Sequence, residues 1–282
     1  IKMENLNAGV FFIGLIIRIF LLFLLYLTKN FHLNFTSDTL NGLQKIHHGK
    51  IIRIGGFIII PSYLLTTVFI YENQIFLIQI TLSLIPAFFY GAKEDLFNNV
   101  SPIKRILGIS LSSFIIVFFL DIQLTDLSLL TINHSFLIIF ISILAMTTMA
   151  NAMNLIDGLN GLSLGNTIIN LIFVLLIASD VEDYFLIQLI LFFIFPFIAM
   201  LLFNFPFAKL FSGDAGSYLM GIIISISVIL LSENNNSVDP FASFLIILFP
   251  LYECIRSFIR RLISGKRIDI PDKDHLHSKV YQ

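Results

Sequence analysis

The chain has 282 residues, of which 57% are hydrophobic and only 12% are charged, and its formal net charge is −1. A soluble domain usually has about a quarter of its residues charged, so this composition excludes an ordinary soluble protein. The single cysteine, Cys254, excludes a disulfide framework and a cysteine-based zinc site. The repeated apolar runs are therefore expected to lie in a lipid bilayer, and we expect no nucleic-acid partner.

Nine apolar segments follow one another along the chain, and each is expected to be a membrane-spanning helix, because a helix satisfies its own backbone groups in lipid. Several are shorter than the roughly 20 residues that a span requires, so they should extend into their flanks. We expect one all-helical integral-membrane domain over residues 1–282. The segments lie at about 8–27, 54–71, 75–91, 106–120, 135–150, 167–179, 184–203, 218–232 and 240–259.

Lysine and arginine are concentrated in alternate connections between these segments. Fifteen of the 17 lie in one set of five connections, which are 28–53, 92–105, 151–166, 204–217 and 256–282. Because positively charged loops remain in the cytoplasm, the N-terminus is expected outside and the C-terminus inside. The five connections should therefore meet at the cytoplasmic surface.

The first two inner connections carry charged groups beside the membrane. Residues 37–56 read SDTLNGLQKIHHGKIIRIGG; their cations suit an anionic ligand, and the closing pair Gly55-Gly56 indicates a close backbone approach. The second connection places Glu94 and Asp95 at the inner end of the third segment. Neighbouring side chains on a helix point about 100° apart, so the two carboxylates need not share a ligand. A solvated, positively charged rim is the alternative for both connections.

The third and fourth inner connections carry the more specific patterns. In NAMNLIDGLNGLSLG, Asn151, Asn154 and Asp157 recur every third residue and share one face of a helical turn, and Asn160 continues the series. Such polar groups are costly at membrane depth unless they are paired or bind a ligand; a polar helix-packing seam is the alternative. In FSGDAGSYLMG, Asp214 lies on a turn at a helix start, which suits a phosphate with a hard cation, or else a simple N-cap.

The fifth inner connection, 256–282, is rich in arginine and contains His275 and His277, which fit phosphate recognition better than zinc. Together the five connections offer oxygen ligands for Mg²⁺, with Mn²⁺ as the alternative ion, and cations for phosphate. They predict a membrane enzyme that acts on a phosphorylated lipid. A transporter is the alternative from another class, although only Arg18 stands at the expected midplane depth. A lipid-phosphate phosphatase using His275 or His277 is the second alternative.

Five motifs resemble, in order, spacing and sidedness, the signature loops of the polyprenyl-phosphate N-acetylhexosamine-1-phosphate transferases, the WecA/MraY-like superfamily. The resemblance implies transfer of N-acetylhexosamine-1-phosphate from a UDP-sugar to undecaprenyl phosphate, with release of UMP, at the bacterial inner membrane. The motifs look most like the lipopolysaccharide and exopolysaccharide branch; the phospho-N-acetylmuramoyl-pentapeptide transferase of peptidoglycan synthesis is the alternative. Family members usually have ten or eleven spans, so one or two C-terminal helices are expected to be missing, and a homodimer stays open. The motifs are QKIHHGKIIRIGG, GAKEDLFNNVSPIKR, NAMNLIDGLNGLSLG, FSGDAGSYLMG and PDKDHLH.

The resemblance also implies roles for individual residues. Asp214 would bind Mg²⁺ with Asn154 as the second protein oxygen, and Asp157 would lie beside the nucleotide and the metal. Asp95 would orient or deprotonate the lipid phosphate, with Glu94 where the family usually has a first Asp. The remaining implied contacts, to phosphates, uracil or the diphosphate, are those of Lys45, His47, Arg53, Asn151, Asn160, Arg261, His275 and His277. Asn160 replaces a frequent Asp, and the final motif lacks one His.

Overall fold

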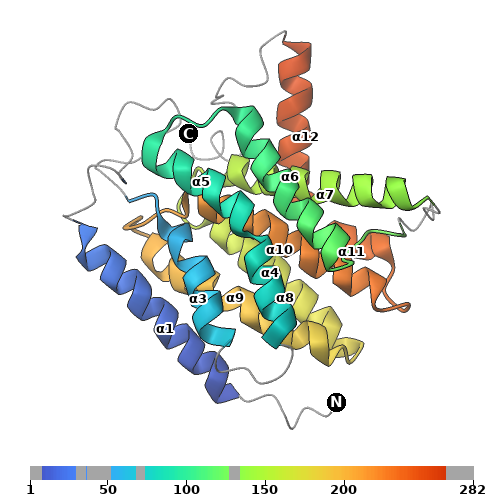
Figure 1. Ribbon diagram of the computed structural model, residues 1–282, viewed down its shortest axis with the longest axis horizontal. Coiled ribbons are helices and arrows are strands. Elements are labelled where there is room, and N and C mark those ends of the chain that lie inside the picture. Colours follow the sequence, from blue (N-terminus) through green and yellow to red (C-terminus); the bar gives the residue numbers. More distant parts are fainter. Residues whose placement is uncertain (1–7, 30–35, 37–51, 68–73, 127–133, 265–282) are drawn as a thin grey trace.

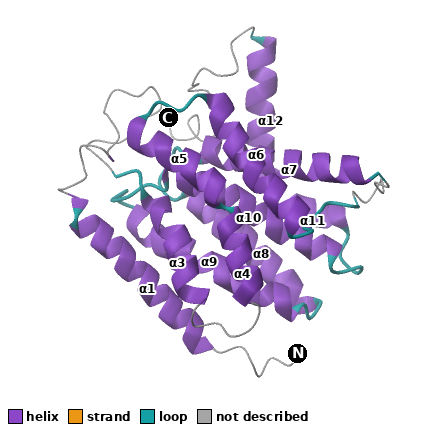
Figure 2. Cartoon of the chain, viewed as in Figure 1, coloured by secondary structure: helices purple, strands orange, loops and turns teal. Residues whose placement is uncertain are grey.

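The computed structural model describes residues 8–29, 36, 52–67, 74–126 and 134–264, and these residues form a helical bundle (Figures 1 and 2). One isolated bridge, between Ile52 and Leu210, is their only extended pairing. The all-helical prediction is thus confirmed for the described residues. The helices are α1 (Ala8–Leu27), η2 (Gly55–Ile58), α3 (Ile59–Thr67), α4 (Gln74–Ser83), α5 (Ile85–Phe97), α6 (Pro102–Phe119), α7 (Ser135–Ile156), α8 (Leu162–Asp180), α9 (Tyr184–Asn204), α10 (Gly213–Glu233), α11 (Pro240–Ile246) and α12 (Leu248–Ile263).

Each of the nine predicted apolar segments coincides with a helix or with a pair of consecutive helices. Among the described residues, α6, α7, α8, α9 and α10 are long and apolar enough to cross a membrane by themselves. Counting α4–α5 and α11–α12 as one span each gives up to seven. The chain is therefore a multi-pass membrane protein. Two shorter apolar helices are Gly14–Leu27, within α1, and Gly55–Thr67, which comprises η2 and α3.

Two predicted segments are bent rather than straight. The axis turns by 42° between α4 and α5 and by 74° between α11 and α12. Proline follows each break, Pro86 after the first and Pro250 after the second. Because proline lacks the backbone N–H and its ring clashes with the preceding turn, both prolines favour a helix start over a continuous helix. The second bend turns α12 away from the bundle, where it projects at the top of Figure 1.

Helix α10 occupies the centre of the bundle (Figure 1). Every residue from Gly213 to Ser232 is buried, and α10 packs against η2, α5, α7, α8, α9 and α11. Small residues let its backbone come close to its neighbours. A Cβ atom on Gly56 would lie 2.5 Å from the Cα of Gly216, so the close approach predicted for the Gly55-Gly56 pair is confirmed.

The same close packing makes Gly91 of α5 a sensitive position. A Cβ atom there would lie 2.5 Å from the Cα of Ala215, and backbone cannot move aside cheaply. We expect Gly91→Ala to lower the free energy of unfolding by about 1–3 kcal/mol, the usual cost of overpacking, measured by thermal unfolding in detergent. Gly165→Ala is the matched control: nothing lies within 4 Å of its added Cβ, so stability should be unchanged or slightly higher. Equal melting temperatures for Gly91→Ala and the unchanged protein would contradict this packing.

Candidate functional site

The centre of the candidate site is the carboxylate of Asp214, which is buried in the first turn of α10. Its Oδ1 accepts hydrogen bonds from Arg53 Nη2 at 3.3 Å and from Asn154 Nδ2 at 3.1 Å. Its Oδ2 accepts from Arg105 Nη1 at 2.9 Å and from the Tyr218 hydroxyl at 3.0 Å. Each arginine also lies within 4.0 Å of a second carboxylate, so the two cations are shared among three carboxylates. Both arginine side chains remain about one-quarter exposed, and an anionic ligand could therefore reach them.

Asp95 holds the turn that carries Asp214. Its Oδ1 accepts the backbone N–H of Asp214 at 2.8 Å, and its Oδ2 accepts that of Ala215 at 3.0 Å. These are two of the N–H groups that a helix start leaves without an intrahelical partner. Asp95 therefore caps α10 from another helix, and the alternative in which Asp214 is itself the N-cap is wrong.

Gly213 makes this capping contact sterically feasible. Its φ is +73°, a conformation that favours glycine. A Cβ atom on Gly213 would also lie 2.5 Å from Asp95 Oδ2. A side chain at this position would therefore displace the capping carboxylate.

Asp157 joins the third inner connection to the fourth. It follows α7 directly, and its carboxylate accepts hydrogen bonds from the hydroxyls of Ser163 and Ser212, the latter at 2.9 Å to Oδ2. Burial raises the pKa of Asp157 to about 6, although the hydrogen bonds from the two hydroxyls lower it. The carboxylate is thus held by neutral donors next to the turn that precedes Asp214.

The predicted series of Asn151, Asn154 and Asp157 is only partly brought together. Asn154 donates to Ser217 Oγ at 2.9 Å as well as to Asp214, so Asn154 and Asp157 both contact the region 212–217. In contrast, Asn151 donates to the Thr147 carbonyl in its own helix at 2.8 Å. Among the described residues, the Asn151 side chain therefore bonds within its own helix and makes no hydrogen bond to Asp214.

Asn160 and Asn204 shape the edge of the site. Asn160 Nδ2 donates to the Pro206 carbonyl at 3.0 Å, and its buried Oδ1 has no hydrogen-bond partner among the described residues. Asn204, the last residue of α9, accepts the Gly161 N–H and donates to the Leu210 carbonyl at 2.9 Å. Asn204 thereby ties the third and fourth inner connections together, and Asn160 offers an acceptor beside them.

The segment before η2 is paired with the segment before α10. The Phe211 N–H donates to the Ile52 carbonyl, and Gly55 N–H donates to Phe211, each at 2.8 Å. Gly56 N–H continues the series to Ser212 at 2.8 Å. This short ladder fixes Arg53 opposite Asp214.

Glu94 supports the connection between α5 and α6. Its Oε2 accepts the Val100 N–H at 2.8 Å, and its Oε1 lies 3.7 Å from Arg105 Nη1. The longer arm of Glu, compared with the family's usual Asp, therefore has two partners in this chain.

We expect Glu94→Asp to retain activity to within about tenfold, the equivalent of the roughly 1.5 kcal/mol of one hydrogen bond to a charged group. The measurement is kcat/KM in the transfer reaction that the motif resemblance implies. Glu94→Gln keeps the arm length and removes only the charge, and so separates reach from electrostatics. Complete loss of activity in Glu94→Asp would mean that the Glu94 carboxylate has a specific task in the reaction.

The predicted metal ligands, Asp214 and Asn154, lie side by side in the site. The described residues contain no group of three or more His, Cys, Asp or Glu that could hold a metal ion. Mg²⁺, however, usually takes one or two protein oxygens and completes its shell with substrate phosphates and water. Asp214 fits this need, and rotating the Asn154 amide would present its Oδ1 beside that carboxylate. The pair predicted from the sequence therefore suits Mg²⁺ bound together with a phosphorylated substrate.

Some functional candidates were missed by the sequence reasoning, and others lie beyond the described residues. Arg105 and Tyr218 contact Asp214 directly, while Ser212 and Asn204 arrange the connections around it. Asn204 could have been found from the sequence, since it is an amide at the end of a helix that is otherwise apolar after Gln188. Four predicted residues, Lys45, His47, His275 and His277, lie outside the described residues.

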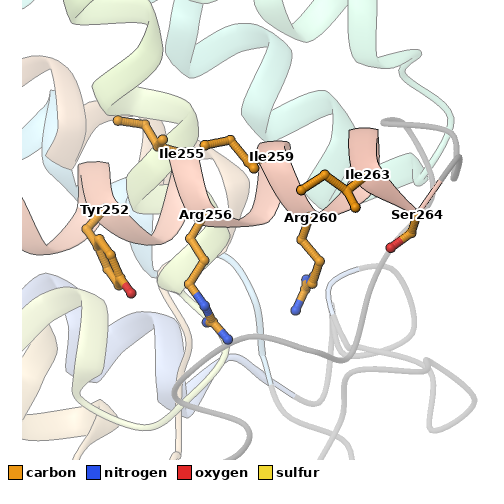
Figure 3. A pocket seen from close by; sticks show the side chains of 7 residues that line it. All are labelled: Tyr252, Ile255, Arg256, Ile259, Arg260, Ile263 and Ser264. Carbon is orange, nitrogen blue, oxygen red and sulfur yellow. The ribbon is translucent and has the colours of Figure 1, made fainter.

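Helix α12 adds a groove that is both apolar and cationic. In Figure 3, Tyr252, Arg256 and Arg260 extend from one side of the helix and Ile255 and Ile259 from the other. Arg256 also pairs with Glu253 at 3.4 Å. Arg261, which was predicted to contact the diphosphate, lies in the last turn of α12. The residues that line the groove, of about 480 Å³, are Tyr252, Ile255, Arg256, Ile259, Arg260, Ile263 and Ser264.

Residues 77–232 match the family described as glycosyl transferase family 4. The chain is 30% identical to an undecaprenyl-phosphate alpha-N-acetylglucosaminyl 1-phosphate transferase of Thermotoga maritima, over 83% of this chain and 69% of the relative. It is 26% identical to a probable undecaprenyl-phosphate N-acetylglucosaminyl 1-phosphate transferase of Bacillus subtilis, over 84% and 67%. A phospho-N-acetylmuramoyl-pentapeptide-transferase of Petrotoga mobilis is 30% identical, over 76% and 73%. The matched region contains Asp95, Arg105, Asn154, Asp157 and Asp214.

Proposed function

The chain belongs to glycosyl transferase family 4, and from that membership we propose that it transfers N-acetylhexosamine-1-phosphate from a UDP-sugar to undecaprenyl phosphate and releases UMP. The observation that carries the proposal is the convergence of Arg53, Arg105 and Asn154 on the buried carboxylate of Asp214. Phosphoryl transfer depends mainly on positioning and on neutralising charge on the transferred group. A carboxylate for a divalent cation and two arginines for phosphate oxygens provide both.

The roles of the residues follow from their contacts. Asp214 and Asn154 would hold Mg²⁺ or, as the alternative, Mn²⁺. The bound ion would neutralise charge on the diphosphate. Arg53 and Arg105, which pair with Asp214, would turn to the phosphate oxygens of the substrate, where arginine can bind in a bidentate manner. Asp95 keeps Asp214 in place through the α10 cap; its direct action on the lipid phosphate stays a prediction.

We further propose that the nine helical segments cross a bacterial inner membrane with the site on the cytoplasmic side. Two observations support this orientation. The lysine and arginine residues lie in one alternate set of connections, and the described site is built from that same set. A UDP-sugar would reach the site from water, while the lipid phosphate would enter from the bilayer. The groove on α12, with isoleucines beside arginines, suits such an amphiphile.

The deciding experiment uses membranes that contain the full chain, radiolabelled UDP-N-acetylhexosamines, undecaprenyl phosphate and Mg²⁺. Labelled lipid and stoichiometric UMP are expected, with loss of product after chelation and recovery with Mg²⁺ or Mn²⁺. The similarity to the Petrotoga mobilis protein makes UDP-N-acetylmuramoyl-pentapeptide the necessary second donor. Product from that donor alone would assign the chain to the peptidoglycan reaction, whereas no lipid product from any donor would refute a transferase.

A further inference from the structure

Helix α9 contains a proline within its length. Pro196 is buried in the second half of this apolar helix. Proline has no backbone N–H, so the carbonyl four residues earlier, that of Phe192, cannot receive its usual hydrogen bond. In a membrane no surrounding water replaces the missing donor, and an unsatisfied carbonyl costs several kcal/mol. The Phe192 carbonyl therefore needs a donor from another element.

Two other helices supply donors at this break. Arg18 Nη2, from α1, donates to the Phe192 carbonyl at 3.3 Å. The Tyr63 hydroxyl, from α3, donates to the next carbonyl, that of Phe193, at 3.0 Å. The hydrogen bonds thus join segments that are 174 and 130 residues apart in the chain.

The three side chains around the break also pack on one another. The Arg18 guanidinium lies 5.8 Å from the centre of the Tyr63 ring, and that ring stacks on Phe192 at 4.6 Å. All three are fully buried. Gly14 leaves room for the guanidinium, because a Cβ atom there would lie 2.9 Å from Arg18 Nη1. The lack of a side chain at Gly14 therefore provides the space that the Arg18 guanidinium occupies.

Arg18 has few other ways to offset the cost of its burial. Its Nε and Nη1 atoms have no hydrogen-bond partner among the described residues. A buried cation without a carboxylate partner is expensive. Its contact with the Phe192 carbonyl, strengthened by the Tyr63 ring, is thus the interaction that a substitution of Arg18 would test.

The elements joined at this break lead to the candidate site. Helix α9 ends at Asn204, which binds the backbone of Gly161 and Leu210. Helix α3 follows η2, whose Gly55 and Gly56 bind the segment just before α10. Movement of the second half of α9 relative to α3 would therefore displace the residues that precede Asp214.

We propose that Arg18 replaces the donor lost at Pro196, that Tyr63 adds a bond at the neighbouring Phe193 carbonyl, and that both act as positioning residues that hold the end of α9 against the site. The activity readout below rests on the proposed transferase function, but the exchange readout does not. The proposal makes a definite claim about compensation. A residue at position 196 that has its own N–H should make Arg18 dispensable.

The test is a double-mutant cycle in the full chain, with wild type, Arg18→Met, Pro196→Ala and the double variant. Hydrogen exchange by mass spectrometry reports on amides 197–211. Arg18→Met should speed their exchange at least about tenfold, as expected for a lost hydrogen bond from a charged donor, and lower kcat more than it changes KM. In the Pro196→Ala background, where the amide of residue 196 can bond to Phe192, the same substitution should change exchange by less than about twofold.

Two further variants keep the proposal testable. Tyr63→Phe retains the ring and removes the hydroxyl, and should give a smaller change in the same direction, including when Arg18→Met does not insert. Thr66→Val is the matched control, because the Thr66 hydroxyl donates within its own helix to Ser62 and exchange in α9 should not change. Three results would overturn the proposal. Arg18→Met could have equal effects in both backgrounds, it could leave the exchange of amides 197–211 unchanged, or it could speed that exchange while kcat stays normal. A wild type that transfers no sugar phosphate would refute the proposed function and leave the exchange comparison intact.

Discussion

Replacing Asp214 with asparagine is expected to reduce sugar-phosphate transfer on the order of 10³-fold, the scale seen when one preorganised electrostatic group is removed from an active site. Asparagine keeps the shape of the side chain and can still accept a hydrogen bond. It loses the negative charge that would bind a divalent cation and that holds Arg53 and Arg105. Raising the Mg²⁺ concentration should not restore the rate, because the site would then offer two neutral amide oxygens and no carboxylate charge to hold the cation.

The measurement for Asp214→Asn is the initial rate of lipid product at low and high Mg²⁺, with membrane insertion and melting temperature followed in parallel. Asp180→Asn is the matched control, since Asp180 is exposed at the far end of α8 and its loss should leave the rate unchanged. Turnover of Asp214→Asn close to the wild-type value at either concentration would contradict the metal assignment.

Replacing Asp95 with asparagine is expected to reduce both activity and stability. A substitution that affected only the catalysed reaction would leave stability unchanged. Both Asp95 oxygens accept backbone N–H groups of α10. An asparagine has one acceptor, and its NH₂ group would face a donor. The cost of leaving a buried donor unsatisfied is about 1–3 kcal/mol. Because the same turn carries Asp214, transfer should fall by at least about 10² as the site loses its alignment.

The Asp95→Asn experiment therefore has two readouts, which are thermal unfolding in detergent and kcat/KM. Asp180→Asn again serves as the control for loss of one carboxylate. Loss of activity with an unchanged melting temperature would refute the capping role and favour direct action of Asp95 on the lipid phosphate. Full activity with lower stability would show that the cap does not position Asp214.

The sequence by itself determined the class of fold and the principal members of the candidate site. Polar groups are costly in lipid, so long apolar runs must be helices and the polar residues that interrupt them must be paired or functional. Asn154 and Asp157 stood out for this reason, Asp214 for its place at a helix start, and Asp95 through the motif resemblance. In the structure Asp95 and Asn154 contact Asp214, and Asp157 contacts Ser212 in the turn before it. Periodicity also placed Asn151 with them, but its amide bonds within its own helix, since spacing fixes a face and not a partner.

Only the tertiary structure decided which groups meet. Arg105 looked like one more cation at a solvated rim, yet it contacts Asp214 across 109 residues of sequence. Pro196 lacks a backbone donor, as any proline does, but the donors beside it, Arg18 and Tyr63, come from two helices that are far from it in the sequence. The local sequence shows which groups need a partner, because the free-energy cost of burying a polar group depends on the type of that group. The identity of the partner depends on which helices pack together, and that is a property of the whole bundle.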